Sequence, residues 1–106
     1  MHWTVTVTTN ATDLKSLCYA YDQSNPGINP ALYEVREFNL LADNSNGAAI
    51  IYVGGSNVSS SDYSVALGSG MSRYYPPKTV GSQRYYLQTY YVKSSTGSLT
   101  LHIEAS

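Results

Sequence analysis

Apolar and polar residues alternate strictly at both ends of the chain, and this pattern constrains the fold more than any other feature. In residues 2–9 the apolar positions are Trp3, Val5 and Val7. In residues 99–105 they are Leu99, Leu101, Ile103 and Ala105. Successive side chains of a strand point to opposite faces, so a period of two residues predicts strands with one buried face. We therefore expect both ends of the chain to lie in β-structure against a common core.

Five further segments have the length and composition of strands: residues 35–42, 48–53, 63–67, 71–75 and 84–93. The continuous apolar run 48–53 is interpreted as a strand buried on both faces. A cluster of turn residues at 43–47 predicts that 35–42 and 48–53 form a hairpin. About seven short strands separated by turns are typical of an antiparallel β-sandwich or barrel, of the jelly-roll or Greek-key type.

Residues 12–22 change period and predict one short N-terminal helix. Their apolar positions follow the i, i+3, i+4, i+7 spacing of a single helix face: Leu14, Leu17, Cys18 and Tyr21. Thr12 or Asn10 is the expected N-cap, with Asp13 in the first turn. Tyr19 and Tyr21 would also fit a strand, so that alternative stays open.

Length and composition exclude several classes of protein. With 106 residues, the chain is expected to form a single domain, 1–106. Its 42% of hydrophobic residues excludes a disordered tail. The apolar run 48–53 is far shorter than the roughly 20 residues of a membrane span. A net charge of -1 lacks the basic excess that nucleic-acid binding needs. No secretory signal is recognised at the N-terminus, which predicts synthesis in the cytoplasm.

The sequence carries no motif for catalysis, a cofactor or a metal. The single cysteine, Cys18, cannot form an intrachain disulfide and is expected to be a small buried hydrophobe. The two histidines, His2 and His102, lie at opposite ends of the chain without metal-ligand spacing. We therefore expect a protein that is not an enzyme. A pocket that brought either histidine against a carboxylate would favour catalysis instead.

Tyrosine is the unusual residue: the chain has eleven Tyr against one Phe. Three adjacent pairs, 74–75, 85–86 and 90–91, cannot point all their rings into one core. The outward rings could serve a protein interface, stack on carbohydrate, or reflect only the strand preference of Tyr. The candidate protein–protein interface residues are Trp3, Arg73, Tyr74, Tyr75, Tyr86, Tyr90 and Tyr91.

Charge is divided unequally along the chain. Residues 1–62 hold two basic and six acidic side chains, whereas residues 63–106 hold four basic and one acidic. A Greek-key fold would interleave the two halves and cancel this difference in space. Alternatively, two oppositely charged surfaces would help identical subunits to dock.

The middle of the chain resembles a segment of small tailed-phage virion proteins. The resemblance covers 36–43 (REFNLLAD), 46–47 (NG), 51–58 (IYVGGSNV) and 63–70 (YSVALGSG), followed by an aromatic strand and a final strand. It implies a small β-sandwich that carries no active site. The segment 19–33, rich in Pro and Asn, departs from the pattern, as does the density of Tyr.

This resemblance implies a role as a capsid decoration (cement) protein, or as a head- or tail-associated protein. The expected partner is the assembled major capsid protein, and the expected form is a homotrimer on the phage head surface. The alternative is a tail-associated module that binds host carbohydrate, with exposed Tyr rings as stacking platforms.

Overall fold

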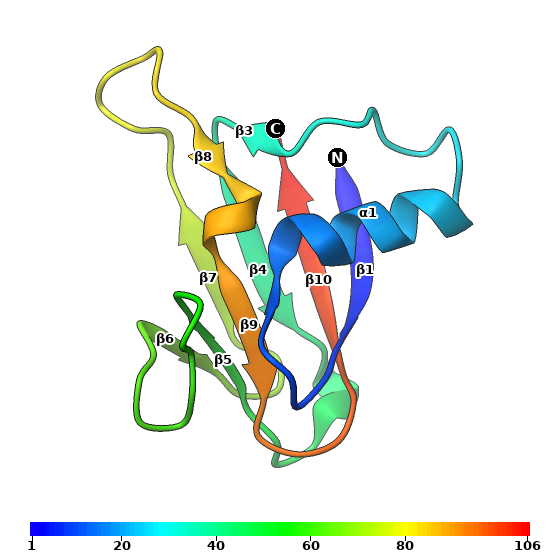
Figure 1. Ribbon diagram of the computed structural model, residues 1–106, viewed down its shortest axis with the longest axis vertical. Coiled ribbons are helices and arrows are strands. Elements are labelled where there is room, and N and C mark those ends of the chain that lie inside the picture. The colour runs from blue at the N-terminus through cyan, green and yellow to red at the C-terminus, as the bar shows by residue number, and fades with distance from the viewer.

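The computed structural model describes all residues 1–106 and is built mainly of antiparallel strands with one α-helix (Figure 1). The longer elements are β1 (His2–Val7), α1 (Leu14–Ser24), β4 (Phe38–Ala42), β5 (Ile51–Gly54), β7 (Ser72–Tyr75), β9 (Tyr91–Ser94) and β10 (Leu99–Ala105). The short strands are β2 (Thr12–Asp13), β3 (Glu34–Val35), β6 (Val65–Leu67) and β8 (Tyr85–Tyr86). Two 3₁₀ turns, η1 (Asn44–Asn46) and η2 (Leu87–Thr89), complete the fold. The expected all-β class with one helix is confirmed.

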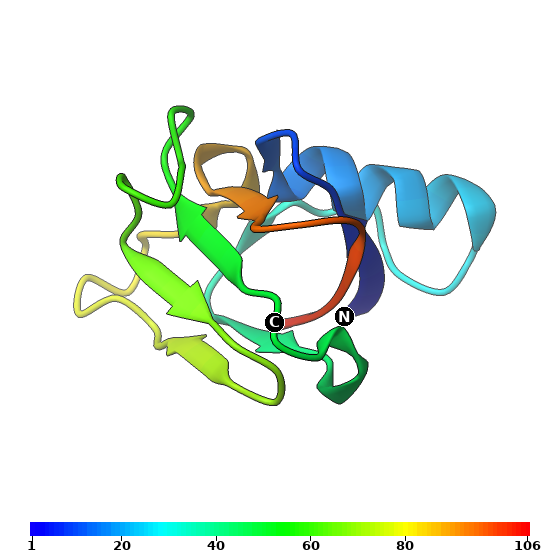
Figure 2. The same cartoon turned by 90° about the horizontal axis from the view of Figure 1, so that it is seen from below.

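Two four-stranded sheets face each other. The first has the order β1-β10-β4-β7 and the second the order β2-β9-β5-β6, while β3 and β8 form a separate pair. Residues 68–71 carry the chain from β6 to β7, so the two sheets meet there (Figure 2). On the opposite side α1 packs against β1 and against η2 and covers this side of the sandwich (Figure 1).

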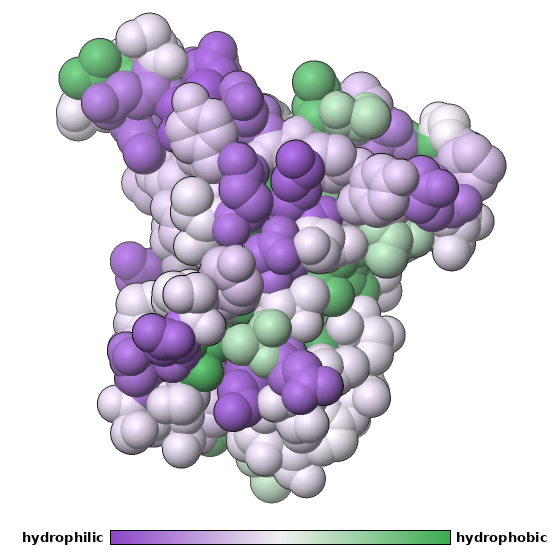
Figure 3. All heavy atoms as spheres, in the orientation of Figure 1, coloured by the Kyte–Doolittle hydropathy of each residue, from purple (hydrophilic) through white to green (hydrophobic).

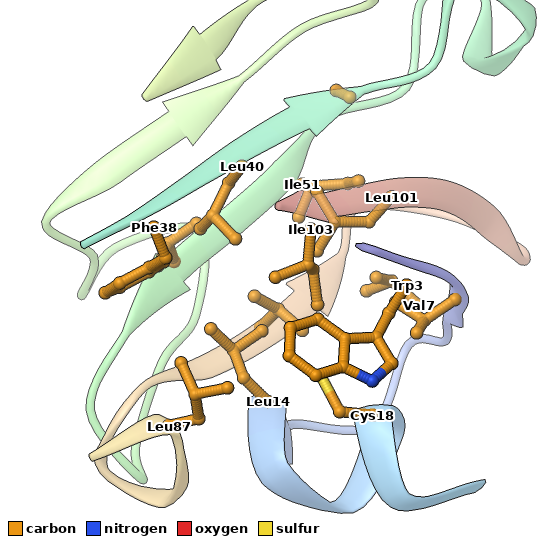
Figure 4. Packing of buried hydrophobic residues seen from close by; sticks show 14 of the residues in the cluster. Trp3, Val7, Leu14, Cys18, Phe38, Leu40, Ile51, Leu87, Leu101 and Ile103 are labelled. Atoms are coloured by element: carbon orange, nitrogen blue, oxygen red, sulfur yellow. The ribbon is translucent and has the colours of Figure 1, made fainter. Parts of the chain in front are cut away.

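The predicted alternation places the core between the sheets. Trp3 pairs with Ile103, Val5 with Leu101 and Val7 with Leu99, and all six side chains are buried. In Figure 4 the Trp3 indole lies over α1, next to Cys18 and Leu14. The remaining inward positions are filled by Val35, Phe38, Leu40, Ala42, Ile51, Val53, Leu67, Leu87, Val92 and Ala105.

The helix forms where its apolar spacing predicts, but its N-cap differs. Asp13 is the cap, and its carboxylate accepts a hydrogen bond from the Ser16 backbone N–H at 3.0 Å. Neither expected cap takes this place, since Thr12 pairs with Val92 in β2 and Asn10 precedes that strand. Cys18 is buried as expected, and burial raises the pKa of its thiol well above the ordinary value.

The predicted hairpin of residues 35–42 and 48–53 is wrong. β4 pairs with β10 and β7 in the first sheet, whereas β5 pairs with β6 and β9 in the second. The turn between them is tied to β10, because the Asn46 amide donates to Thr100 O at 3.0 Å and accepts from Thr100 N at 2.9 Å. The chain therefore crosses between sheets at this point. β5 is also not buried on both faces, since Tyr52 is half-buried.

The predicted long strand 84–93 is interrupted in the middle. It divides into β8, η2 and β9, and Leu87 at the start of η2 is fully buried. The Thr89 hydroxyl donates to Tyr86 O at 2.8 Å and holds the turn. A regular strand would place Tyr85 and Leu87 on one face and Tyr90 on the other. The turn instead directs all three inward.

Asp22, near the end of α1, anchors the loop 25–33 to the sandwich by hydrogen bonds. Its carboxylate accepts hydrogen bonds from the buried Trp3 indole at 3.0 Å, the Asn29 amide at 3.3 Å and the Tyr33 hydroxyl at 2.8 Å. Burial, and then the bond to Asp22, raise the pKa of Tyr33 to about 12. Asn29 also bonds both backbone groups of His2, at 3.0 and 2.8 Å. The Asn29 side chain thus holds the loop against the start of β1.

Candidate functional site

Four aromatic rings meet at one end of the sandwich and form what we call the tyrosine cluster: Phe38, Tyr75, Tyr85 and Tyr90. Phe38 is central and fully buried. It stacks on Tyr75, with ring centroids 4.2 Å apart, and meets Tyr85 and Tyr90 edge-on at 5.2 Å. Such stacked and T-shaped pairs are the favoured arrangements of aromatic rings.

Strand geometry explains which tyrosines enter the cluster. Tyr75 is the cross-strand partner of Phe38, so it points inward, and its neighbour Tyr74 points to the outer face of the sheet. The Tyr85 hydroxyl donates to Pro76 O at 2.6 Å, which ties β8 to the end of β7. Tyr75 and Tyr90 are half-buried, and this burial raises the pKa of both hydroxyls.

Two cations lie over the exposed side of the cluster. Arg73 shares the inner face of β7 with Tyr75, two residues away, and its guanidinium lies 5.5 Å from the Tyr75 ring centroid. Lys78 Nζ lies 4.8 Å from the Tyr85 ring centroid. Neither is neutralised, because the one ion pair in the structure joins His102 and Asp43. The cluster therefore presents uncompensated positive charge on aromatic surface.

The strand that carries Arg73 and Tyr75 is an edge strand. β7 pairs with β4 on one side and has no ladder partner on the other. An open edge of this kind can add a strand from another chain, with the cluster beside it to supply specificity.

A groove of about 570 Å³, lined by both polar and apolar residues, lies on the outer face of the first sheet. Its floor is one row across four strands: His2 on β1 pairs with Glu104 on β10, Glu104 with Asn39 on β4, and Asn39 with Tyr74 on β7. Further lining residues are Met1, Ile28, Asn29, Glu37, Phe38, Ala105 and Ser106. We call this site the outer groove.

The seven candidate interface residues do not form one continuous surface in the structure. The prediction of Trp3 as an interface residue is wrong, because its side chain is 0% exposed and fills the core. Tyr75, Tyr90 and Arg73 meet at the cluster, whereas Tyr74 and Tyr86 are 51% and 45% exposed on other faces. Tyr91 is half-buried in β9, where it pairs with Asp13 and Gly54.

The sequence prediction does not include three residues of the cluster: the buried Phe38, Tyr85 and the adjacent cation Lys78. The adjacent pair at 85–86 was a signal, but the pattern could not show which ring points inward. Both sheets mix strands from the two halves of the chain, so the unequal charge of residues 1–62 and 63–106 does not divide the molecule in space. This outcome favours the interleaved alternative.

The two histidines come together on the outer face of the first sheet. Their rings stack with centroids 5.9 Å apart, and His102 Nε2 lies 2.7 Å from Asp43 Oδ1. The Thr4 hydroxyl lies 3.2 Å from His102 Nδ1. The outer groove is lined by His2 and by its cross-strand partner Glu104, so one pocket does bring a histidine beside a carboxylate, although no ion pair joins these two side chains. His102 and Asp43 do not line this groove. The structure gathers no group of three or more His, Cys, Asp or Glu side chains for a metal.

Asp43 predicts a loss of stability in acid. Hydrogen bonds from the Ser45 hydroxyl, from His102 and from the Ser45 backbone hold its pKa well below the usual range. A lowered carboxyl pKa contributes stability in full above the unfolded value of about 4, and this contribution is lost progressively as the pH falls from there through the lower pKa of the folded state. We expect the urea midpoint of the natural protein to fall more between about pH 7 and about pH 3 than that of Asp43→Asn. Equal falls would show that the Asp43 charge does not contribute.

Figure 3 shows a face that is mostly hydrophilic or of neutral hydropathy, with apolar atoms only in small separate areas. No α-helix of the structure has the length and apolar character that crossing a membrane requires. Comparison of the chain with protein-family models, with curated proteins and with solved structures finds no match.

Proposed function

We propose that this chain is a capsid decoration protein of a tailed phage, which binds the assembled major capsid protein and has no catalytic role. The observation that carries the proposal is the tyrosine cluster with two unpaired cations beside an open strand edge. The resemblance of residues 36–70 to small virion proteins supplies the biological setting. In this proposal the chain acts on the outside of the phage head.

The chemistry of the cluster suits attachment to another protein. Interface cores are enriched in Tyr and Arg, and a half-buried Tyr ring offers apolar area while its hydroxyl stays solvated. Arg73 and Lys78 would steer the approach toward an acidic surface of the capsid. Attachment as a homotrimer would match the threefold positions of an icosahedral shell.

Co-sedimentation with purified capsids tests this proposal. In the variant Arg73→Glu/Lys78→Glu, we expect capsid binding to weaken about tenfold or more, because both steering charges at the cluster are reversed. The matched control is Lys15→Glu/Lys93→Glu, which makes the same change of net charge elsewhere. Lys15 also lies over a tyrosine ring, 5.8 Å from the Tyr33 centroid, so it controls for the loss of a cation–π contact.

Two outcomes would contradict the proposal. The natural protein could fail to sediment with capsids while it sediments with purified tails, which would assign it to the tail. Equal weakening by the two double variants would show that net charge, and not the cluster, governs binding. Urea unfolding of each variant tests whether the variant keeps the natural fold.

A further inference from the structure

We propose that the outer groove is a binding site for a neutral oligosaccharide. This proposal does not rest on capsid attachment, because the groove and the tyrosine cluster share only the buried Phe38 and otherwise use different side chains. The groove has the volume of an ordinary small-molecule site, which spans roughly 300–1,000 Å³.

The floor of the groove is a linear row of four different polar groups. An imidazole, a carboxylate, an amide and a phenol ring follow one another on neighbouring strands: His2, Glu104, Asn39 and Tyr74. Neighbouring strands lie about 4.8 Å apart, so the row is roughly 14 Å long. A row of this length would contact two or three consecutive sugar rings, each one facing a different side chain.

The walls of the groove are fixed by the fold. On the β1 side, Asn29 is held by both backbone groups of His2 and by Asp22, which places the loop 25–33 at the end of the row. At the other end, Tyr74 projects from β7 with about half of its surface exposed. Desolvation and the neighbouring Glu37 carboxylate raise the pKa of Tyr74.

The hydrogen-bonding inventory distinguishes between classes of ligand. Glu37 and Glu104 offer only acceptors, whereas Asn39 offers both donors and acceptors and Tyr74 adds a hydroxyl. Sugar hydroxyls both donate and accept, so they can satisfy this mixed set. A lysine or arginine side chain cannot accept from the Asn39 and Tyr74 donors, and an anion would be repelled by two carboxylates that have no ion-pair partner.

The exposed ring of Tyr74 supplies the apolar component. A sugar ring carries a face of C–H groups that packs flat on an aromatic ring, and Tyr offers such a surface with little conformational freedom to lose. Other exposed tyrosines lack this setting. Tyr19 and Tyr63 have similar exposure but do not line the outer groove, so they serve as internal controls.

Nuclear magnetic resonance titration of the isotope-labelled protein tests the site. The probes are the neutral trisaccharides maltotriose, cellotriose and triacetylchitotriose, each at about 10 mM, above the dissociation constants of weak sites. We expect at least one sugar to shift the backbone signals of His2, Asn39, Tyr74 and Glu104 in a saturable way. Tyr74→Ala should raise its dissociation constant about tenfold, whereas Tyr63→Ala should leave it unchanged.

Three results would overturn the proposal. No saturable shift with any of the trisaccharides is one, and shifts centred on the tyrosine cluster are another. A trilysine peptide that binds the groove more tightly than every sugar would assign the two carboxylates to a cationic partner. Capsid co-sedimentation of Tyr74→Ala is measured separately, so a failed sugar site leaves the capsid proposal standing, and the reverse also holds.

Discussion

Replacing Trp3 with alanine should lower the free energy of unfolding by about 3–5 kcal/mol, which is the usual cost of removing a fully buried tryptophan. The Trp3 side chain is 0% exposed and fills the space between β1, β10 and α1 (Figure 4). The helix would lose its principal contact with the first sheet. Natural domains have only about 5–15 kcal/mol of stability, so the variant would lie close to the unfolding threshold.

The same position allows packing to be separated from hydrogen bonding. Trp3→Phe keeps most of the apolar contact but removes the N–H that donates to Asp22. Trp3→Phe should lower the free energy of unfolding less than Trp3→Ala does. It should also increase the mobility of the loop 25–33, because Asn29 in this loop bonds the same Asp22 carboxylate. Urea unfolding measures the first effect, and amide hydrogen exchange in the loop measures the second. A loss below about 1 kcal/mol for Trp3→Ala would return Trp3 to the candidate surface residues.

Local periodicity accounts for the parts of the fold that the sequence predicts correctly. The alternation of residues 2–9 and 99–105 determines which side chains are buried, because a shift of one residue would expose the whole apolar set. The helix is correct for a similar reason, since Leu14 and Cys18 lie one turn apart on its inner face. Both patterns are set by residues close together in the chain.

Contacts between segments that are distant in the sequence account for the predictions that are wrong. Nothing local shows that Asn46 bonds the backbone of Thr100, yet this contact turns an apparent hairpin into a crossing between sheets. Likewise, Asp22 is an ordinary helix carboxylate in the sequence and a shared acceptor for Trp3 and Tyr33 in the fold. These pairings depend on tertiary packing, which residue spacing does not encode.

The two candidate sites differ in how much of each could be predicted. The excess of Tyr indicates that some rings must leave the core, and three of the predicted residues do meet at the cluster surface. The outer groove could not be predicted, because its floor depends on the strand order β1-β10-β4-β7. That order brings residues 2, 104, 39 and 74 into one row.

Phe38→Ala should have the second large effect, again about 3–5 kcal/mol of unfolding free energy. The ring is 1% exposed and contacts three tyrosines, so its loss leaves a cavity between the sheets at the cluster. The remaining rings would then be less firmly packed, and water would reach their hydroxyls. We expect the raised pKa of Tyr75 and of Tyr90 to fall toward the ordinary value in this variant.

Ultraviolet titration of tyrosinate formation measures this shift, and urea unfolding measures the stability. Phe38→Leu is the matched control, because it keeps apolar volume and removes only the aromatic contacts. If Phe38 acts mainly as a filler, the leucine variant should recover most of the stability. If ring stacking organises the cluster, Phe38→Leu should remain stable but lose affinity for capsids, since Tyr75 and Arg73 would no longer be held in place. An alanine variant with natural stability would contradict the central place of Phe38 in the core.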